Sequence, residues 1–282
     1  MKIMLTGSRG MLGRTLVQHL SEHTVFLSDR GNGDITNAQA FFALMKDVRP
    51  DAVVHCAAMT TVDLCETKED EAFRVNALGT SNVAAACYQY GARLLAVSTD
   101  YVFDGNLNRP YHEFDVPTGG INVYGQSKWA GEQAIRTHCP NHIIARTSWL
   151  YGEGGPSFVH TMLRLADRSQ TQLKVVNDQV GNPTSVTAVA VALKRLIERP
   201  ELVGTFHISC EGAASWCEFA REIFRLAGSG MQVISCTSEE YPMVARRPHN
   251  SQLEKKMLRL YGLPSMPNWK QALREFLERG RF

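Results

Sequence analysis

Five short apolar runs recur along the first half of the chain, separated by stretches with helical periodicity. The runs cover residues 2–6, 24–28, 52–58, 92–99 and 142–148. Each run is too short for a buried helix and almost wholly apolar, as strands are when both faces of their sheet are covered. Strands that alternate with helices predict an α/β fold with a Rossmann-type, doubly wound parallel sheet.

Helical patterns lie between these runs and continue beyond them. The first three fall at 11–20, 38–48 and 70–90, and Thr36 or Asn37 is placed to cap the second. After residue 150 the alternation loosens, with helical candidates at 157–169, 186–199, 215–227 and 268–279 and strand-like runs at 173–176 and 205–209. The sequence predicts one domain over 1–150 and a smaller C-terminal region over 151–282, with interleaving of the two left open.

Charge and cysteine content argue against several classes of protein. The chain has 282 residues, 30 basic and 28 acidic, and a net charge of +2, which gives no reason to expect nucleic acid or an anionic membrane as partner. Seven cysteines without CxxC spacing are typical of free thiols in a reducing compartment, not of disulfides or a zinc site. The apolar runs are too short for a signal peptide or a membrane span. We expect a cytoplasmic protein with no resident metal site.

A glycine-rich turn joins the first predicted strand to the first predicted helix. Gly7, Gly10 and Gly13 let backbone amides approach an anion at a helix N-terminus, where the helix dipole favours negative charge. The spacing GxxGxxG differs by one residue from the dinucleotide fingerprint, and tight turns also use glycine. Its position directly after the first strand favours nucleotide binding.

The end of the second predicted strand is where the adenosine ribose of a dinucleotide is expected. Asp29 could accept hydrogen bonds from the ribose hydroxyls of NADH, whereas Arg30 could pair with the 2′-phosphate of NADPH. Arg9, inside the glycine turn, also favours NADPH. NADPH is therefore the expected cofactor, with NADH left open and an ordinary surface loop as the alternative. Asp34 and Ile35 are expected near the adenine.

Tyr124, Lys128 and Thr99 form a candidate catalytic group. Tyr124 and Lys128 lie four residues apart and would share one helix face. A nearby ammonium is expected to lower the pKa of the phenol, which could then supply the proton that a ketone needs after hydride transfer. Ser98 and Thr99 end the fourth strand, at the edge where α/β sheets bind ligands, and offer a hydroxyl for the carbonyl oxygen.

Longer motifs across the chain resemble one enzyme family. Those typical of the extended short-chain dehydrogenase/reductases are TGSRGMLG (6–13), CAAMTTVD (56–63), NALGT (76–80), STDYVFDG (98–105) and YGQSK (124–128). Those similar to the dTDP-4-dehydrorhamnose reductases within them are RTSWLYG (146–152), DQVGNPT (178–184) and ARRPHNSQL (245–253). One departure is Gly119-Gly120, where such proteins usually have a proline, and this puts the expected path of the loop before YGQSK in doubt.

The resemblance implies roles for the matching residues. Tyr124 would be the proton donor, Lys128 would tune it and bind the ribose, and Thr99 would hold the carbonyl. Residues implied to contact the cofactor are Gly10, Met11 and Leu12 at the pyrophosphate, with Ala58 and Thr60 lining the site and Asn76 bracing it. Residues implied to contact the substrate are Asp100 and Trp149 beside the sugar, and Gln179, Asn182 and Arg247 toward the nucleotide.

The implied activity is reduction of the C4 ketone of a dTDP-linked 4-keto-6-deoxyhexose, the last step of dTDP-L-rhamnose biosynthesis, by a monomer or homodimer. Whether a divalent metal assists assembly is left open. One alternative is an epimerase, which would keep NAD tightly bound. A dehydratase would carry a glutamate after Asp100, where this chain has Tyr101. A non-catalytic regulatory subunit of the methionine adenosyltransferase type would not need Thr99, Tyr124 and Lys128 together, which argues against that alternative.

Overall fold

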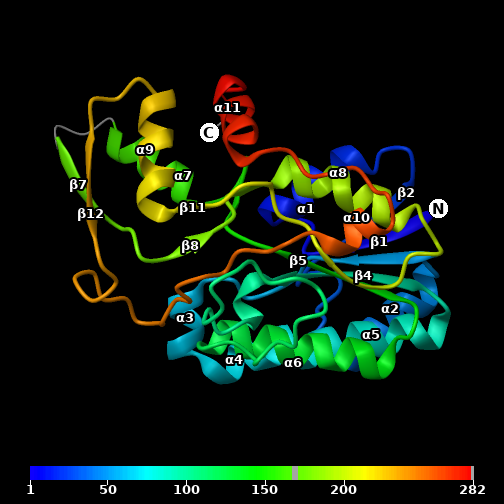
Figure 1. Ribbon diagram of the computed structural model, residues 1–282. Coiled ribbons are helices and arrows are strands. Elements are labelled where there is room, and N and C mark those ends of the chain that lie inside the picture. Colours follow the sequence, from blue (N-terminus) through cyan, green and yellow to red (C-terminus); the bar gives the residue numbers. More distant parts are fainter. Residues whose placement is uncertain (167–170, 281–282) are drawn as a thin grey trace.

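Six parallel strands form the central sheet (Figure 1). The computed structural model describes residues 1–166 and 171–280. In sheet order the strands are β10 (Gly204–His207), β5 (His142–Thr147), β4 (Arg93–Thr99), β3 (Ala52–His55), β1 (Lys2–Thr6) and β2 (Thr24–Ser28). Every neighbouring pair runs parallel. The predicted Rossmann-type α/β fold is confirmed, and all five apolar runs contain a strand of this sheet.

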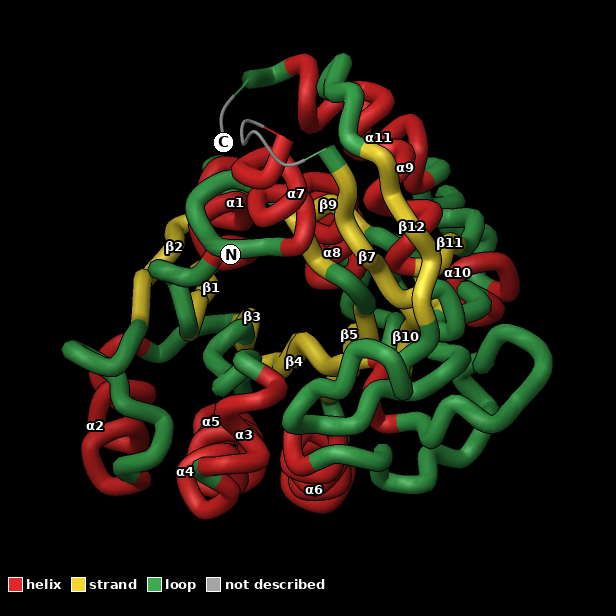
Figure 2. The backbone as a smooth tube through the Cα atoms, turned by 90° about the vertical axis from the view of Figure 1, so that its left-hand side faces the viewer, coloured by secondary structure: helices red, strands yellow, loops and turns green. Residues whose placement is uncertain are grey.

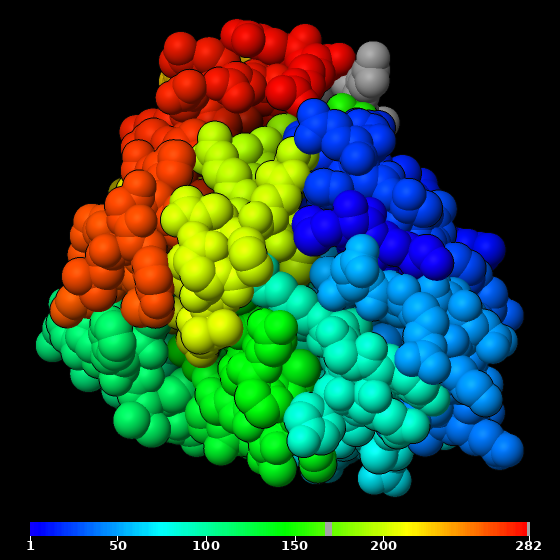
Figure 3. Space-filling view, turned by 90° about the vertical axis from the view of Figure 1, so that its right-hand side faces the viewer, coloured from blue at the N-terminus to red at the C-terminus, as the bar shows by residue number. Residues whose placement is uncertain are grey.

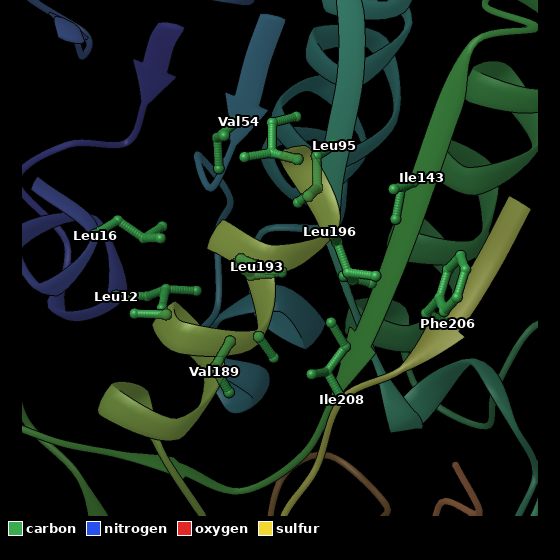
Figure 4. Close-up of a cluster of buried hydrophobic side chains, with 14 of the residues drawn as sticks. Leu12, Leu16, Val54, Leu95, Ile143, Val189, Leu193, Leu196, Phe206 and Ile208 are labelled. Atoms are coloured by element: carbon green, nitrogen blue, oxygen red, sulfur yellow. The ribbon is translucent and has the colours of Figure 1, made fainter. Parts of the chain in front are cut away.

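Helices cover both faces of the sheet (Figure 2). One face carries α1 (Met11–His19) and α8 (Val186–Ile197), and the other carries α2 (Ala38–Val48), α5 (Thr80–Tyr90) and α6 (Val123–His138). On the first face Leu16 of α1 and Leu193 of α8 pack toward Leu95 and Ile143 of the strands (Figure 4). Each such buried side chain contributes roughly 1.5–3 kcal/mol, so these layers hold the strand ends in fixed positions.

The prediction of one continuous helix over 70–90 is wrong. The chain there forms α4 (Glu69–Phe73), a π-helical segment η1 (Arg74–Gly79) and then α5, preceded by a short helix α3 (Val62–Thr67) that was not predicted. A π-helical turn inserts one extra residue per turn and is often found at functional sites. This one contains the buried Asn76.

The second stretch of the chain builds a smaller core beside the sheet. Its elements are α7 (Phe158–Ala166), β7 (Gln172–Val176), α9 (Trp216–Leu226), β12 (Gln232–Cys236), α10 (Lys256–Leu260) and α11 (Trp269–Glu278). Strands β7 and β12 pair in parallel. Two short pairs join β6 (Leu150–Tyr151) to β9 (Thr184–Ser185) and β8 (Val180–Gly181) to β11 (Ala214–Ser215). Of the predicted helix over 157–169, residues 167–169 lie outside the described residues.

Two elements from this second stretch return to the central sheet. Strand β10 pairs with β5, and α8 covers the sheet beside α1. The Arg93 guanidinium, at the start of β4, donates to the carbonyls of Ile197 and Leu202 at 2.9 and 2.5 Å. Figure 3 shows the yellow segment, near residue 200, lying against segments from the first half of the chain. Residues after 150 therefore build the smaller core and one edge of the sheet.

Three further properties bear on function. None of the helices in the described ranges combines the length and apolar character needed to cross a bilayer. All the cysteines of the chain are free thiols, and only Cys56 is more than marginally accessible. Within residues 1–166 and 171–280, no three His, Cys, Asp or Glu side chains gather as metal ligands would.

Candidate active site

The glycine turn between β1 and α1 is packed so closely that larger residues do not fit. Gly7 has φ of +68°, and a Cβ there would lie 2.6 Å from the Ala57 nitrogen on the neighbouring strand end. A Cβ on Gly13 would lie 2.3 Å from the Gly7 carbonyl oxygen. Among the described side chains none caps α1, so its first N–H groups face the turn without a side-chain acceptor. The turn is built to receive an anion.

A cavity of about 250 Å³ lies against this turn. It is bounded by the ends of β1, β2 and β3 and by the π-helical segment. The predicted cofactor residues in its lining are Gly7, Gly10, Asp29, Arg30, Asp34, Ile35 and Ala58. Met11, Leu12, Gly13 and Thr60 lie outside the lining, and the Leu12 side chain points into the core (Figure 4). Any contact of Leu12 with a phosphate would therefore be made by its backbone.

Two charged residues in the cavity lining, Asp29 and Arg30, each pair with a charged residue of opposite sign. Arg9 Nε lies 2.7 Å from Asp29 Oδ2, so the charge of Asp29 is already balanced. Arg30 is 78% exposed, and its Nη2 lies 4.0 Å from Glu71 Oε1 on α4. Such an exposed and distant pair is weak, which leaves the Arg30 guanidinium available to an incoming anion.

The predicted catalytic residues meet at the carboxyl end of β4. Asn122 caps α6 by accepting a hydrogen bond from Gly125 N at 2.8 Å, which starts the helix just before Tyr124 and Lys128. The Thr99 hydroxyl at the end of β4 lies near enough to the Tyr124 phenol to influence the pKa of that phenol. The Lys128 ammonium, one turn further along α6, donates to the Val97 carbonyl at 2.8 Å. Thr99 and the Val97 carbonyl that binds Lys128 both belong to the last residues of β4, next to the part of α6 that carries Tyr124.

The expected lowering of the Tyr124 pKa by Lys128 is wrong for this structure. Burial raises the pKa of Tyr124 well above its ordinary value, and the neighbouring Thr99 hydroxyl opposes this rise only in part. Burial also lowers the pKa of Lys128 to about 8, although the nearby Glu132 carboxylate acts in the opposite direction and raises it. The phenol therefore stays protonated at neutral pH, as a proton donor must be.

The loop before α6 follows a path that a proline could not take. Gly119 and Gly120 have φ of +93° and +79°, whereas proline is fixed near −65°. This is the place where the sequence departs from the family pattern, and the departure lies in the loop rather than in the catalytic residues.

Asn76, on the π-helical segment, connects two parts of the site through its side-chain amide. Its Oδ1 accepts from Met59 N at 2.8 Å, and its Nδ2 donates to Met59 O and to Ser127 Oγ, each at 3.0 Å. These bonds tie the loop containing Ala58 and Thr60 to the helix that carries Tyr124. These three hydrogen bonds are consistent with the bracing role that the family resemblance implies for Asn76.

A buried ion pair that was not predicted lies beneath the catalytic helix. Glu132 and Arg146 are each 1% exposed, and their Oε2 and Nη2 atoms lie 2.7 Å apart. Ser98 donates to Glu132 Oε1 at 2.6 Å, so its hydroxyl turns away from Thr99 and the site. The one sequence signal for this pair is a charged residue within the apolar run 142–148.

Asp100, directly after Thr99, offers an acceptor with no partner. Thr99 donates to its Oδ1 at 3.0 Å, while Oδ2 is buried and has no hydrogen bond among the described residues. Burial raises the pKa of Asp100 to about 7. A buried oxygen left unpaired is costly, and such atoms often await a ligand donor.

Trp149, just after β5, and Gln179, from the second stretch, are joined through Trp216, which was not predicted. Trp149 stacks on Trp216 with ring centroids 3.5 Å apart. Trp216 Nε1 donates to Gln179 Oε1 at 3.2 Å. Trp216 was missed because an aromatic residue at the start of a helix is usually part of a core.

The remaining predicted substrate residues are engaged within the protein. Asn182 Nδ2 donates to Gly212 O at 2.6 Å, and its Oδ1 accepts from Leu253 N at 2.7 Å. Arg247 makes a two-pronged ion pair with Asp63 of α3 at 2.7 and 2.9 Å. Both side chains therefore hold segments of the C-terminal stretch in place.

Comparison with known proteins agrees with this architecture. The model of the family described as "RmlD substrate binding domain" matches residues 1–282. A dTDP-4-dehydrorhamnose reductase of Sinorhizobium fredii is 39% identical over 98% of this chain and 97% of that protein. The solved structure of a dTDP-4-dehydrorhamnose reductase from Clostridium acetobutylicum covers 100% of both chains at 41% identity, with a TM-score of 0.96. One from Bacillus anthracis, in complex with NADP, covers 99% of both chains at 40% identity, with a TM-score of 0.95.

Proposed function

Because the chain belongs to the family described as the RmlD substrate binding domain, we propose that it reduces the C4 ketone of dTDP-4-dehydrorhamnose, a dTDP-linked 4-keto-6-deoxyhexose, to give dTDP-rhamnose. This is an NADPH-dependent oxidoreductase reaction and the last step of dTDP-L-rhamnose biosynthesis. The observation that carries the proposal is the meeting of Thr99, Tyr124 and Lys128 at the carboxyl end of β4, in a chain whose glycine turn fits a dinucleotide.

The lining of the cavity suits the phosphates and the adenosine part of NADPH in its chemistry. The glycine turn and the uncapped start of α1 would hold the pyrophosphate, because both present backbone N–H groups. Arg30, and Arg9 once released from Asp29, would pair with the 2′-phosphate. Asp29 would then be free for ribose hydroxyls, which leaves NADH acceptable. When bound, NADPH supplies the hydride.

The catalytic side chains would act on the substrate oxygen. Thr99 donates a hydrogen bond to the C4 carbonyl and fixes its direction. Tyr124 donates its proton to that oxygen as the alkoxide forms, since burial keeps the phenol protonated until that moment. Lys128, one helical turn after Tyr124 and held at the Val97 carbonyl in this structure, would bind the cofactor's ribose and supply positive charge for the phenolate that remains.

The dTDP-sugar would lie between the two parts of the molecule. Asp100 Oδ2, unpaired in the described residues, would accept a hydrogen bond from a sugar hydroxyl. Trp149 would pack beside the sugar, and Gln179, Asn182 and Arg247 would lie toward the nucleotide. We further propose that the enzyme works in the cytoplasm as a monomer or homodimer, without nucleic acid or membrane.

The decisive experiment is an NADPH oxidation assay with a panel of dTDP-4-keto sugars. We expect oxidation only when a keto sugar is present, with dTDP-4-dehydrorhamnose among the active substrates. Failure of every sugar to consume NADPH would contradict the proposal, and NAD retained through purification would instead favour an epimerase.

Replacing Arg30 by alanine is expected to weaken NADPH binding more than NADH binding. Only NADPH carries the 2′-phosphate, and a single exposed charged contact is worth roughly 1–2 kcal/mol, or about 5–30-fold in the dissociation constant. Titration calorimetry with both cofactors measures the ratio, and NADH serves as the internal control. An equal loss for both cofactors would place the 2′-phosphate elsewhere, with Arg9 as the next residue to replace.

A further inference from the structure

The Trp149–Trp216 pair is an unusual arrangement of two aromatic side chains. Their ring centroids are 3.5 Å apart and their planes differ by 2°. Aromatic pairs normally prefer offset or edge-to-face packing to such close parallel stacking. Trp149 lies between β5 and β6, whereas Trp216 is the first residue of α9, so the contact joins elements far apart in the chain.

The position of Trp149 combines a strained backbone with an indole N–H that has no hydrogen-bond partner among the described residues. Its φ of +46° lies in the left-handed region, which side chains other than glycine rarely adopt. Its Nε1 is buried and has no hydrogen-bond partner among the described residues. Gly181 leaves room for the ring, since a Cβ there would lie 2.5 Å from a ring carbon of Trp149. With no hydrogen bond to orient it, the indole depends on the stack against Trp216.

Trp216 itself is firmly anchored. It follows Ser215, whose capping box with Glu218 fixes the first turn of α9. Its ring lies 4.7 Å from that of Phe158 between centroids. Its Nε1 donates to Gln179 Oε1 at 3.2 Å, and Gln179 Nε2 donates in turn to Ser238 Oγ at 2.8 Å. One anchored side chain therefore orients both the Trp149 ring and the Gln179 amide.

We propose that Trp216 is a positioning residue of the nucleotide-sugar site, which sets the orientation of Trp149 and Gln179 without needing to touch the substrate itself. This inference rests on the proposed function, in which those two residues contact the dTDP-sugar. It follows that Trp216 acts on substrate affinity and leaves the cofactor cavity, in the other half of the molecule, unaffected.

Two variants separate the two contacts of Trp216. Trp216→Leu removes the stack and the N–H donor, and we expect KM for the dTDP-sugar to rise about 10-fold or more, since one stack and one hydrogen bond each contribute on the order of a few-fold. Trp216→Phe keeps a six-membered aromatic ring in the stack and loses the N–H donor with the five-membered ring, and a smaller rise of about 2–5-fold is expected. The dissociation constant of NADPH should stay within twofold in both.

The matched control is Trp269→Phe. Trp269 is buried in the same cluster and meets Phe219 edge-on at 5.7 Å between centroids, and among the described residues its ring does not stack on Trp149. It should lower stability without raising KM. Circular dichroism adds a readout of the stack itself, because the electronic transitions of two stacked indoles couple. Both Trp216 variants should lose the paired band that this coupling produces, and Trp269→Phe should keep it.

Calorimetry with dTDP alone separates this inference from the proposed function. If no sugar is turned over but dTDP binds the wild-type protein and binds Trp216→Leu about 10-fold more weakly, the positioning role stands and the reaction is misassigned. A Trp216→Leu protein that loses the paired band yet keeps KM and dTDP affinity within twofold would overturn the inference. If that variant does not fold, Trp216→Phe is judged by the same measurements. Absence of dTDP binding by the wild type would overturn both proposals.

Discussion

Tyr124→Phe is expected to lower turnover of the dTDP-sugar roughly 10²–10⁴-fold while NADPH affinity stays unchanged, the range typical of a lost general acid. The substitution removes one oxygen and its proton and keeps the ring, so packing against Tyr101, at 6.0 Å between centroids, is retained. Single-turnover measurement of NADPH oxidation gives the chemical step directly. Fluorescence titration of NADPH gives its affinity.

A matched control for this experiment is Tyr111→Phe. Tyr111 is also buried, stacks on Phe103 and donates its phenol proton to Asp104 at 2.8 Å, in a part of the molecule with no assigned catalytic role. It should cost stability and leave the rate within a few-fold. A near-normal rate in Tyr124→Phe would show that another group supplies the proton, and Lys128 would then be the residue to replace.

Glu132→Gln is expected to have the largest effect on stability. It leaves the Arg146 charge buried without its counter-ion, and breaking a buried pair in this way typically costs about 3–5 kcal/mol. Denaturant unfolding measures the change. The exposed pair Arg199–Glu201 provides the control, because Glu201→Gln should change the free energy of unfolding very little. Equal effects in the two variants would mean that the buried pair contributes no more than a surface one.

The same pair makes a defined contribution to acid sensitivity. Burial alone would raise the pKa of Glu132, but the charges of Arg146 and Arg136 and their hydrogen bonds lower it to about 2. A carboxylate with a lowered pKa stabilises the fold above its unfolded-state value, near ~4.3, and that contribution disappears as pH falls toward about 2. Glu132→Gln should therefore lose less stability than the wild type over this interval.

The central sheet was predictable because its strands are short, apolar and separated by helices. The strand-like run predicted at 205–209 overlaps β10 (Gly204–His207), but nothing in a five-residue run indicates which sheet it joins. The π-helical segment was missed because 70–90 has the composition of an ordinary helix. Its extra residue per turn follows from the tertiary bonds of Asn76 to Met59 and Ser127, which no local pattern records.

The candidate site also contains residues that could be predicted from the sequence and residues that could not. Thr99, Tyr124 and Lys128 were identified because each lies at a strand end or on one helix face, where spacing alone predicts direction. Trp216 could not be found, because its importance lies in a stack with a residue more than sixty positions away. The direction of the Tyr124 pKa shift could not be predicted from the sequence either. Burial raises this pKa and neighbouring polar groups lower it, and only the structure shows how deeply the phenol is buried.

The late return of β10 to the sheet has a consequence for how the protein is made. When residue 147 has emerged from the ribosome, β5 is the outer strand and its free edge has no partner. Its partner ends at His207, roughly 60 residues later, which at about 5–20 residues per second is a wait of about 3–12 s. An unpaired apolar edge can pair with any other nascent strand during that time. The period of greatest risk of misassembly is thus set by the distance along the chain between two strands that lie side by side.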